Sequence, residues 1–284
     1  QKIDNPLMAV SKGGIVLASK GGTSVWQVSE KGEIQEFLAD APLTNIKIGD
    51  NGYLLALMDE KNYYGGLRVY NKQGVPIFHW AAGTCNLIDA SLAPDGRTLA
   101  ISVVELQDLN LTGKILLFDI TKGEQQYAEK VFSDNMVSSL RWADNNRIIC
   151  VGDKKLGVVD RQGNERWGFD YGGQALNFFD ISENNNLVLV TGGGSLDRRM
   201  MVKSFSLSGT QNGEYQYEGE INNVSASGGK ILISSMYEVI LVDKRGKERT
   251  RKTSEKEIYN AYIYKKGNSV FLDEGGFAEI FMMK

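Results

Sequence analysis

Histidine, cysteine and proline are scarce in this sequence: its 284 residues include one histidine, two cysteines and four prolines. One histidine and two cysteines are too few for a zinc cluster or a disulfide framework, so both kinds of small stabilised domain are excluded. We expect Cys85 and Cys150 to be unpaired thiols, with Cys150 buried in a strand. We expect His79 at the surface or in packing, because general-base catalysis needs an oriented partner and none stands at a suitable spacing.

Long apolar runs and a strong excess of one charge are also missing. No run reaches the roughly 18 apolar residues of a membrane helix, and the longest apolar-rich stretch, ILISSMYEVILV, is interrupted by Ser234, Ser235 and Glu238. The formal net charge of −3 argues against a dedicated nucleic-acid-binding protein, because such proteins carry a clear excess of Lys and Arg. A hydrophobic fraction of 42% and a charged fraction of 24% are ordinary for a globular protein.

Glycine, by contrast, is abundant, with 32 residues, and it recurs in one kind of turn. The segment VVDRQGNERWGF reads as strand, turn and strand, and similar turns occur in VSEKGEI, YNKQGVP, FDITKGE, SLSGTQ and VDKRGKE. Neighbouring turn glycines are 37 to 49 residues apart, and they are Gly32, Gly74, Gly123, Gly163, Gly209 and Gly246. Each is expected to have a positive φ, so Gly163→Val should destabilise the protein by roughly 1 to 3 kcal/mol.

A repeat of this length, with four strands in each copy, predicts a β-propeller. In the copy that begins at residue 136 the four strands are MVSSLRW, RIICV, LGVVD and NERWGF. Second strands are nearly continuous apolar runs, as in sheets covered on both faces, whereas outer strands are more polar. We therefore predict an all-β fold, a seven-bladed β-propeller of four-stranded antiparallel blades, forming a single domain over residues 1–284. The last copy lacks its outer strand, so the N-terminal segment QKIDNP is predicted to close the ring.

Two stretches resemble known propeller families. SLAPDGRTLAIS is similar to the repeat segment of Trp-Asp-repeat and TolB-type propellers, and GVVDRQGNERWGFDYGG resembles the repeat of quinoprotein-type propellers. The adjacent cysteine pair and the haem motif of quinoprotein enzymes are missing, so the resemblance implies a fold and no cofactor or metal. The whole chain resembles an uncharacterised family of membrane-anchored propellers from Gram-positive bacteria. This implies an extracytoplasmic location, with any anchor upstream of Gln1; the alternative is a cytoplasmic location.

The connections between second and third strands differ in length, and this difference predicts the interaction face. Three of them are long, DEKNYYGG in blade 2, VELQDLNLTG in blade 3 and GGGSLDRR in blade 5. Apolar and aromatic side chains on loops are enriched at binding surfaces. The alternative is that these side chains fold back onto the tops of the blades. The predicted partner-binding residues are Tyr63, Tyr64, Leu106, Leu109, Leu111 and Leu196.

The segment DKRGKERTRKTSEK is a dense, mostly basic cluster. It is either a solvated outer edge or a contact for anionic lipid headgroups or cell-wall polymers. Its candidate anionic contacts are Lys247, Arg249, Arg251 and Lys252. The segment TGGGSLDRR resembles a phosphate-binding loop only superficially, because it joins two strands and no helix follows it.

Taken together, these features favour a non-enzymatic interaction scaffold that binds an unknown protein or cell-envelope polymer through the face with the long connections. The partner is not expected to be a nucleic acid, and no catalytic residues are proposed. One alternative is a small-ligand sensor that uses the central channel, and a further one is a lyase or hydrolase on the propeller fold. A group of carboxylates, histidine and arginine at one mouth of the channel would favour the enzyme.

Overall fold

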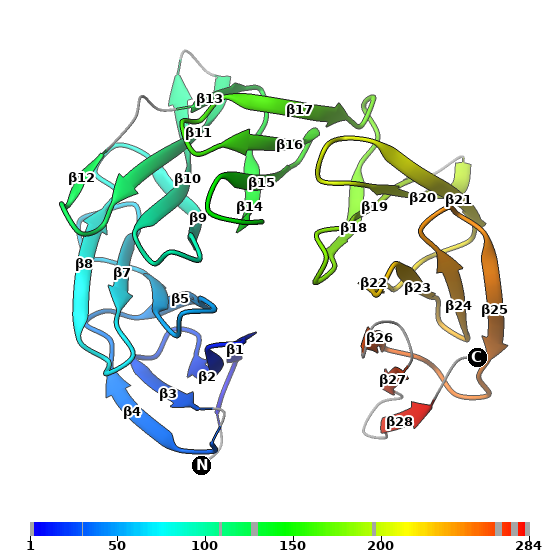
Figure 1. Ribbon diagram of the computed structural model, residues 1–284, viewed down its shortest axis with the longest axis horizontal. Coiled ribbons are helices and arrows are strands. Elements are labelled where there is room, and N and C mark those ends of the chain that lie inside the picture. Colours follow the sequence, from blue (N-terminus) through cyan, green and yellow to red (C-terminus); the bar gives the residue numbers. More distant parts are fainter. Residues whose placement is uncertain are drawn as a thin grey trace. The chain divides into compact units, whose positions relative to one another are not determined.

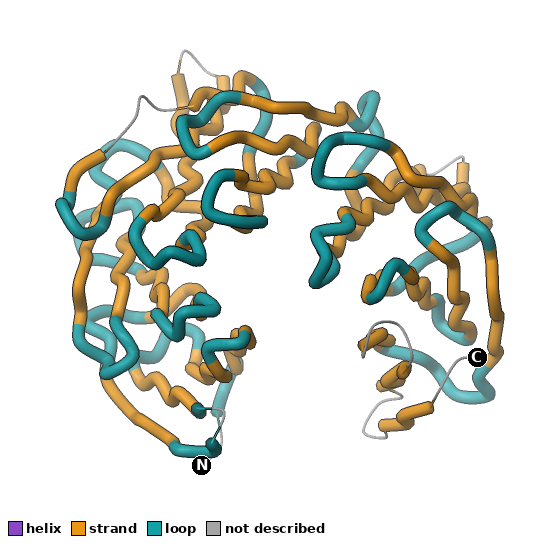
Figure 2. The backbone as a smooth tube through the Cα atoms, viewed as in Figure 1, coloured by secondary structure: helices purple, strands orange, loops and turns teal. Residues whose placement is uncertain are grey.

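The computed structural model describes residues 3–29, 31–107, 110–125, 130–194, 197–264, 269–273 and 278–281. Every regular element in these residues is a β-strand, joined to its neighbours by turns and loops (Figure 2). No helix in this part of the chain is long and apolar enough to cross a membrane. The chain divides into two compact units, Gln1–Arg166 and Trp167–Lys284, and we describe each by itself.

The first unit contains four antiparallel sheets in chain order (Figure 1). The first two are β1 (Pro6–Ser11), β2 (Gly14–Ser19), β3 (Ser24–Val28) and β4 (Ile34–Leu38), then β5 (Leu43–Ile48), β6 (Leu54–Met58), β7 (Gly66–Tyr70) and β8 (Pro76–Ala81). The third is β9 (Asn86–Leu92), β10 (Thr98–Gln107) and β11 (Asn110–Asp119), with β12 (Glu124–Gln125) and β13 (Lys130–Ser133) both paired to β11. The fourth is β14 (Val137–Trp142), β15 (Arg147–Gly152), β16 (Lys155–Asp160) and β17 (Glu165–Asp170), whose last strand continues into the second unit.

The second unit contains three more antiparallel sheets. The fifth and sixth are β18 (Leu176–Ile181), β19 (Leu187–Gly194), β20 (Asp197–Phe205) and β21 (Gln211–Glu218), then β22 (Asn223–Ser227), β23 (Lys230–Ser234), β24 (Glu238–Asp243) and β25 (Glu248–Thr253). The seventh has three described strands, β26 (Asn260–Tyr264), β27 (Ser269–Asp273) and β28 (Ala278–Phe281). Seven successive antiparallel sheets confirm the predicted fold class, and we call them blades 1 to 7.

The hydrophobic core lies between neighbouring blades of each unit, where middle strands of one sheet face those of the next. One cluster joins Leu55, Leu67 and Val69 of blade 2 to Leu99 and Ile101 of blade 3. Corresponding clusters join blades 1 and 2, 3 and 4, 5 and 6, and 6 and 7. Second strands such as β6, with every residue buried, therefore read as continuous apolar runs, and exposed outer strands such as β25 read as polar.

The turn glycines have the backbone conformation that the repeat predicts. All six have positive φ angles, between 71° and 89°. In several of these turns the residue three positions before the glycine organises the loop with its side-chain oxygen. Asp160 accepts hydrogen bonds from the backbone N–H groups of Gln162 (2.9 Å) and Asn164 (2.8 Å), and Asn71 and Asp243 do the same in blades 2 and 6. The repeated Asp/Asn-x-x-Gly pattern is thus a repeated turn.

Asp160 is expected to make stability depend on acid pH. Burial alone would raise the pKa of Asp160, but hydrogen bonds from Asn164 and Gln162 and the Arg166 guanidinium outweigh burial and hold its pKa below 3.8. A carboxyl whose folded pKa is lowered stabilises the fold above its unfolded pKa, and this contribution disappears as pH falls through the folded pKa. Asp160→Asn should therefore be less stable than the parent at pH 7, and the difference should shrink below about pH 4.

Urea unfolding of both proteins between pH 7 and pH 3 measures this difference. Asp59→Asn, in an exposed loop, is the control for the loss of one carboxylate. A difference for Asp160→Asn that is constant over the whole range would contradict the assignment.

Three sequence-based expectations need correction or stay open. The connections of blades 3 and 5 are mostly strand and not loop, because β10 and β11 pair from Thr98↔Asp119 to Gln107↔Asn110, and β19 and β20 continue to Gly194↔Asp197. In both segments the two strands continue to pair, so the hairpin becomes longer and no loop forms.

The N-terminal segment contacts blade 1, because the carbonyls of Asp4 and Asn5 accept hydrogen bonds from the Ser19 hydroxyl and the Lys20 N–H. Ring closure by the N-terminal segment and a single domain over residues 1–284 stay predictions.

Candidate interaction surface

The connection between β6 and β7 in blade 2 is held in place by its backbone. Tyr64 donates its N–H to the carbonyl of Ala82 (2.8 Å), and Leu87 donates its N–H to the carbonyl of Tyr64 (3.1 Å). Gly65, with a φ of +123°, lies so close to the start of blade 3 that an added Cβ would lie 2.8 Å from the Leu87 Cβ. The loop therefore lies along the chain that enters blade 3.

The same connection is also fixed from its other side by a side-chain pair. His79 Nε2 on β8 contacts the Glu60 carboxylate at 2.9 and 3.1 Å. The prediction of a surface position for His79 agrees with this structure, whereas the expectation that it has no partner is wrong. Glu60 and His79 are 19 residues apart in the sequence, so their spacing does not predict the pair. The two side chains meet because strand pairing places β8 beside the loop.

Although its backbone is anchored, the blade 2 connection leaves its two aromatic rings in solvent. Tyr63 and Tyr64 have exposed fractions of 47% and 61%. These values argue against the alternative in which the rings fold back onto the blade.

The extended hairpin of blade 3 carries the second exposed group. Leu106 on β10 and Leu111 on β11 are a cross-strand pair, and their exposed fractions are 67% and 57%. The pairing of β9 with β10 reaches only Val104↔Asn86, so this end of the hairpin extends beyond the first strand of its own blade. Two apolar side chains are therefore presented on a rigid ladder.

Blades 2 and 3 bring these two groups to the same side of the first unit. Leu87, which bonds to Tyr64, pairs with Val103 on β10, three residues before Leu106. We call Tyr63, Tyr64, Leu106 and Leu111 the blade 2–3 patch. Leu109 and Leu196 lie outside the described residues, and the blade 5 connection belongs to the second unit.

Loop length as a criterion missed a further exposed group, in the second unit. The connection between β23 and β24 has only three residues, yet it exposes Met236 and Tyr237, and Tyr259 is exposed just before β26. Its backbone repeats the arrangement of blade 2: Ser254 donates its N–H to the carbonyl of Tyr237, and Ile258 donates its N–H to that of Met236. An aromatic residue in the connection between second and third strands, whatever the length of that connection, would have predicted this group.

The basic cluster on β25 is largely neutralised by neighbouring carboxylates. Arg249 donates two hydrogen bonds to Asp243, and Arg251 bonds to both Glu238 and Glu248. The hydrogen bonds that Arg251 donates to Glu248, together with those it donates to Glu238, raise the pKa of Arg251 above its ordinary value. Lys252 pairs with Glu279 at 3.6 Å, whereas Lys247 is exposed at the hairpin tip. Most of the predicted anionic contacts are thus already engaged within the protein.

Tyr215 on β21 completes this network. Burial, followed by a hydrogen bond to Glu248, raises the pKa of Tyr215 to about 12. The phenol also accepts a hydrogen bond from Arg251 (3.0 Å), so the network joins the outer strands of blades 5 and 6. Its arrangement serves packing between blades.

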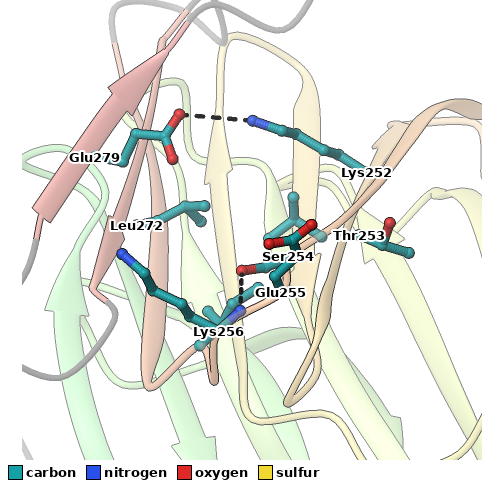
Figure 3. Close-up of a pocket in the computed structure, with 9 residues that line it drawn as sticks. Lys252, Thr253, Ser254, Glu255, Lys256, Leu272 and Glu279 are labelled. Carbon is teal, nitrogen blue, oxygen red and sulfur yellow. Dashed lines mark hydrogen bonds and ion pairs between the residues drawn. The ribbon is translucent and has the colours of Figure 1, made fainter.

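A small cavity of about 250 Å³ is lined by residues of β24, β25, β27 and β28 and of the segment that leads to β26 (Figure 3). Its apolar lining comes from Val239, Ile258 and Leu272, and the Lys252–Glu279 ion pair crosses one side of it. Two lysines and two glutamates line the cavity, so its charges balance and do not favour a ligand of either sign.

An ion pair ties together the first strands of three blades in the first unit. Lys47 Nζ on β5 lies 2.5 Å from Asp89 Oδ2 on β9, and it donates a second hydrogen bond to the carbonyl of Leu140 on β14 (3.2 Å). The Leu140 N–H donates to the same Asp89 oxygen (2.7 Å), and Asp89 is only 3% exposed. The pair therefore compensates a buried charge and sets the spacing of these strands.

Neither cysteine is bonded to the other. Both cysteines are free and Cys150 is buried, as predicted, and Cys85 is buried as well. Burial raises the pKa of both thiols, which keeps them protonated and unreactive at neutral pH. Among the residues that the structure describes, no group of three or more His, Cys, Asp or Glu side chains is placed to hold a metal ion.

Seven successive antiparallel blades, with a core between neighbours in each unit, define a β-propeller protein. The chain belongs to the family described as "Family of unknown function (DUF5711)", whose model matches residues 1–281. No curated protein sequence matches the chain.

Solved structures with a similar fold come from proteins of low sequence identity to this chain. Hydrazine synthase from Kuenenia stuttgartiensis has a TM-score of 0.65 at 11% identity, covering 100% of this chain and 97% of that chain. The β-propeller domain of Cps50 (Swd1) from "Myceliophteria_thermophila" has a TM-score of 0.63 at 13% identity, covering 100% and 98%. BamB from Moraxella catarrhalis has a TM-score of 0.62 at 13% identity, covering 98% and 82%. At these identities the likeness shows the fold alone.

Proposed function

We propose that this protein is a non-enzymatic interaction scaffold that binds a protein or a cell-envelope polymer through the blade 2–3 patch. The single observation that carries the proposal is that four large apolar or aromatic side chains stay exposed on backbone that is anchored. Exposed apolar groups of this kind mark interaction sites. Aromatic side chains on a fixed backbone contribute much of the binding energy and lose little conformational entropy on binding.

The class of partner follows from the family resemblance. An extracytoplasmic location would place the patch among envelope proteins and polymers. The blade 5 connection, in the second unit, is a separate contact in this proposal.

The test is a double substitution in the patch, Tyr64→Ser with Leu106→Ser. Because both side chains are exposed, the melting temperature should change little, by about 2 °C or less. Capture of the partner from envelope extracts of the source cells should fall by at least about tenfold, as expected when two anchor side chains are lost.

Ile34→Ser with Leu38→Ser is the matched control. These two residues on the outer strand β4 are 70% and 65% exposed, and their replacement removes similar apolar area elsewhere on the unit. Capture that is unchanged in the patch variant, or reduced equally in the control, would contradict the proposal. A patch variant that unfolds would show that the side chains serve packing.

A further inference from the structure

A second cavity, of about 490 Å³, lies in the other unit, on blades 5 and 6. It is formed by turns: the connection from β18 to β19, the hairpins β20–β21 and β22–β23, and the hairpin β24–β25. All of these turns join first to second strands or third to fourth strands. In an antiparallel blade they lie at the opposite end from the connections that carry Met236 and Tyr237.

The cavity contains a buried amide whose hydrogen bonding is incomplete. Asn186 is 9% exposed, its backbone is fixed by Ser182, and its Oδ1 accepts a hydrogen bond from Asn212 Nδ2 (3.1 Å). Its Nδ2 has no hydrogen-bond partner among the residues that the structure describes. A buried amide donor without an acceptor is unfavourable, so an oxygen atom from a bound molecule would complete the site.

The chemistry of this amide favours a hydroxyl group as the bound atom. If both amides are rotated, Asn186 Nδ2 bonds to Asn212 and the unpartnered atom becomes an acceptor oxygen. A hydroxyl serves either arrangement because it both donates and accepts. A polyol or sugar offers several such groups.

The charged side chains of the cavity favour an anionic ligand. Lys244, Arg245 and Arg249 line it against one carboxylate, Asp243, which gives a net charge of +2. Asp243 is itself occupied, because it accepts hydrogen bonds from the backbone of Arg245 and Lys247 and from the Arg249 guanidinium. Burial alone would raise the pKa of Asp243, but these bonds hold it below its ordinary value.

Another acidic residue next to the lining, Glu183, is also engaged. Glu183 accepts hydrogen bonds from Ser227 Oγ (3.1 Å) and from the backbone N–H of Gly228 (2.9 Å). Lys244 and Arg245 are exposed at the hairpin tip, and their two positive charges match a phosphate monoester, which carries about −1.5 to −2 at pH 7.

We propose that this cavity binds a phosphorylated polyol, with the phosphate group at Lys244 and Arg245 and a hydroxyl group at Asn186. The proposed anion contact therefore lies at the tip of the β24–β25 hairpin. It does not lie along strand β25, where Arg249 and Arg251 are paired with carboxylates. It uses no residue of the blade 2–3 patch and therefore stands or fails independently of the scaffold proposal.

Calorimetric titration of the whole chain with sn-glycerol 3-phosphate, inorganic phosphate and glycerol tests this site. We expect one molecule of glycerol 3-phosphate to bind, about tenfold more tightly than inorganic phosphate, and binding to weaken with added NaCl. Lys244→Glu with Arg245→Glu should lower this affinity by at least about tenfold, because two charge-assisted contacts are lost and reversed. Lys20→Glu with Lys122→Glu, at exposed turns of the first unit, makes the same change of charge and should bind as the parent does.

Asn186→Ala separates the hydroxyl contact from the charge. It should bind inorganic phosphate as the parent does, which also shows that the site is folded, while its preference for glycerol 3-phosphate should disappear. Absence of glycerol 3-phosphate binding, equal binding by the charge-reversed variant, or an unchanged preference in Asn186→Ala would each overturn the proposal. The variant Tyr64→Ser with Leu106→Ser should bind glycerol 3-phosphate normally.

Discussion

Lys47→Met is expected to lower the free energy of unfolding by about 2 to 4 kcal/mol, one of the two largest single-residue effects we anticipate. The substitution keeps most of the side-chain volume but leaves the Asp89 carboxylate, with a side chain 5% exposed, without its cation. Lys47 itself is 30% exposed, so the loss should fall below that of a fully buried pair.

The double variant Lys47→Met with Asp89→Asn tests the cause of this loss. The amide oxygen can still accept the Leu140 N–H, while the uncompensated charge is gone, so much of the lost stability should return. Urea unfolding of the parent, both single variants and the double variant gives the coupling free energy between Lys47 and Asp89. A neutral Lys47→Met, or a double variant as unstable as the sum of the single variants, would contradict the role of the pair.

Gly246→Ala should cost at least about 3 kcal/mol, whereas Gly32→Ala at the same turn position should cost about 1 kcal/mol. Both glycines have nearly the same φ, +83° and +81°, so the cost of a left-handed backbone is shared. They differ in their surroundings: a Cβ on Gly246 would lie 1.9 Å from the carbonyl oxygen of Glu214, while a Cβ on Gly32 would meet none of the described residues within 4 Å.

The difference between these two variants isolates the close approach of the blade 6 hairpin to β21. Thermal and urea unfolding of both proteins under one condition measures it. Equal losses would show that conformational strain, and not contact between neighbouring backbones, explains the glycine at position 246.

The sequence predicted these turns because their requirements are local. A positive φ depends only on the turn, so the turn glycines could be identified directly from the sequence. The second strands were predictable for a related reason, since both of their faces are covered and their pattern is a simple apolar run.

Long-range contacts could not be read in the same way. Lys47, Asp89 and Leu140 are brought together from three blades, and Arg251 finds Glu238 through the pairing of β24 with β25. The partners follow from strand register, which a single sequence does not specify at this distance. For this reason the sequence suggested that Arg249 and Arg251 on β25 could bind anions, although both are paired with carboxylates in the structure.

The candidate surface was partly predictable for the same reasons. Tyr63 and Tyr64 stand in a true loop, so their exposure agrees with the pattern. Leu106 and Leu111 were assigned to a loop, but they extend a hairpin because alternating Val, Leu and Thr residues sustain the ladder. Tyr237 was missed because a three-residue connection carries no signal of length.

Site-specific photo-cross-linking tests the central claim, binding through the blade 2–3 patch, most directly. A benzophenone amino acid is placed at Tyr64, at Leu106 or, as a control, at Ile34, which is equally exposed on β4. Each protein is irradiated in envelope extracts of the source cells. We predict one common adduct from positions 64 and 106 and none of it from position 34. The same adduct from position 34 at equal yield, or unrelated adducts from positions 64 and 106, would contradict the claim.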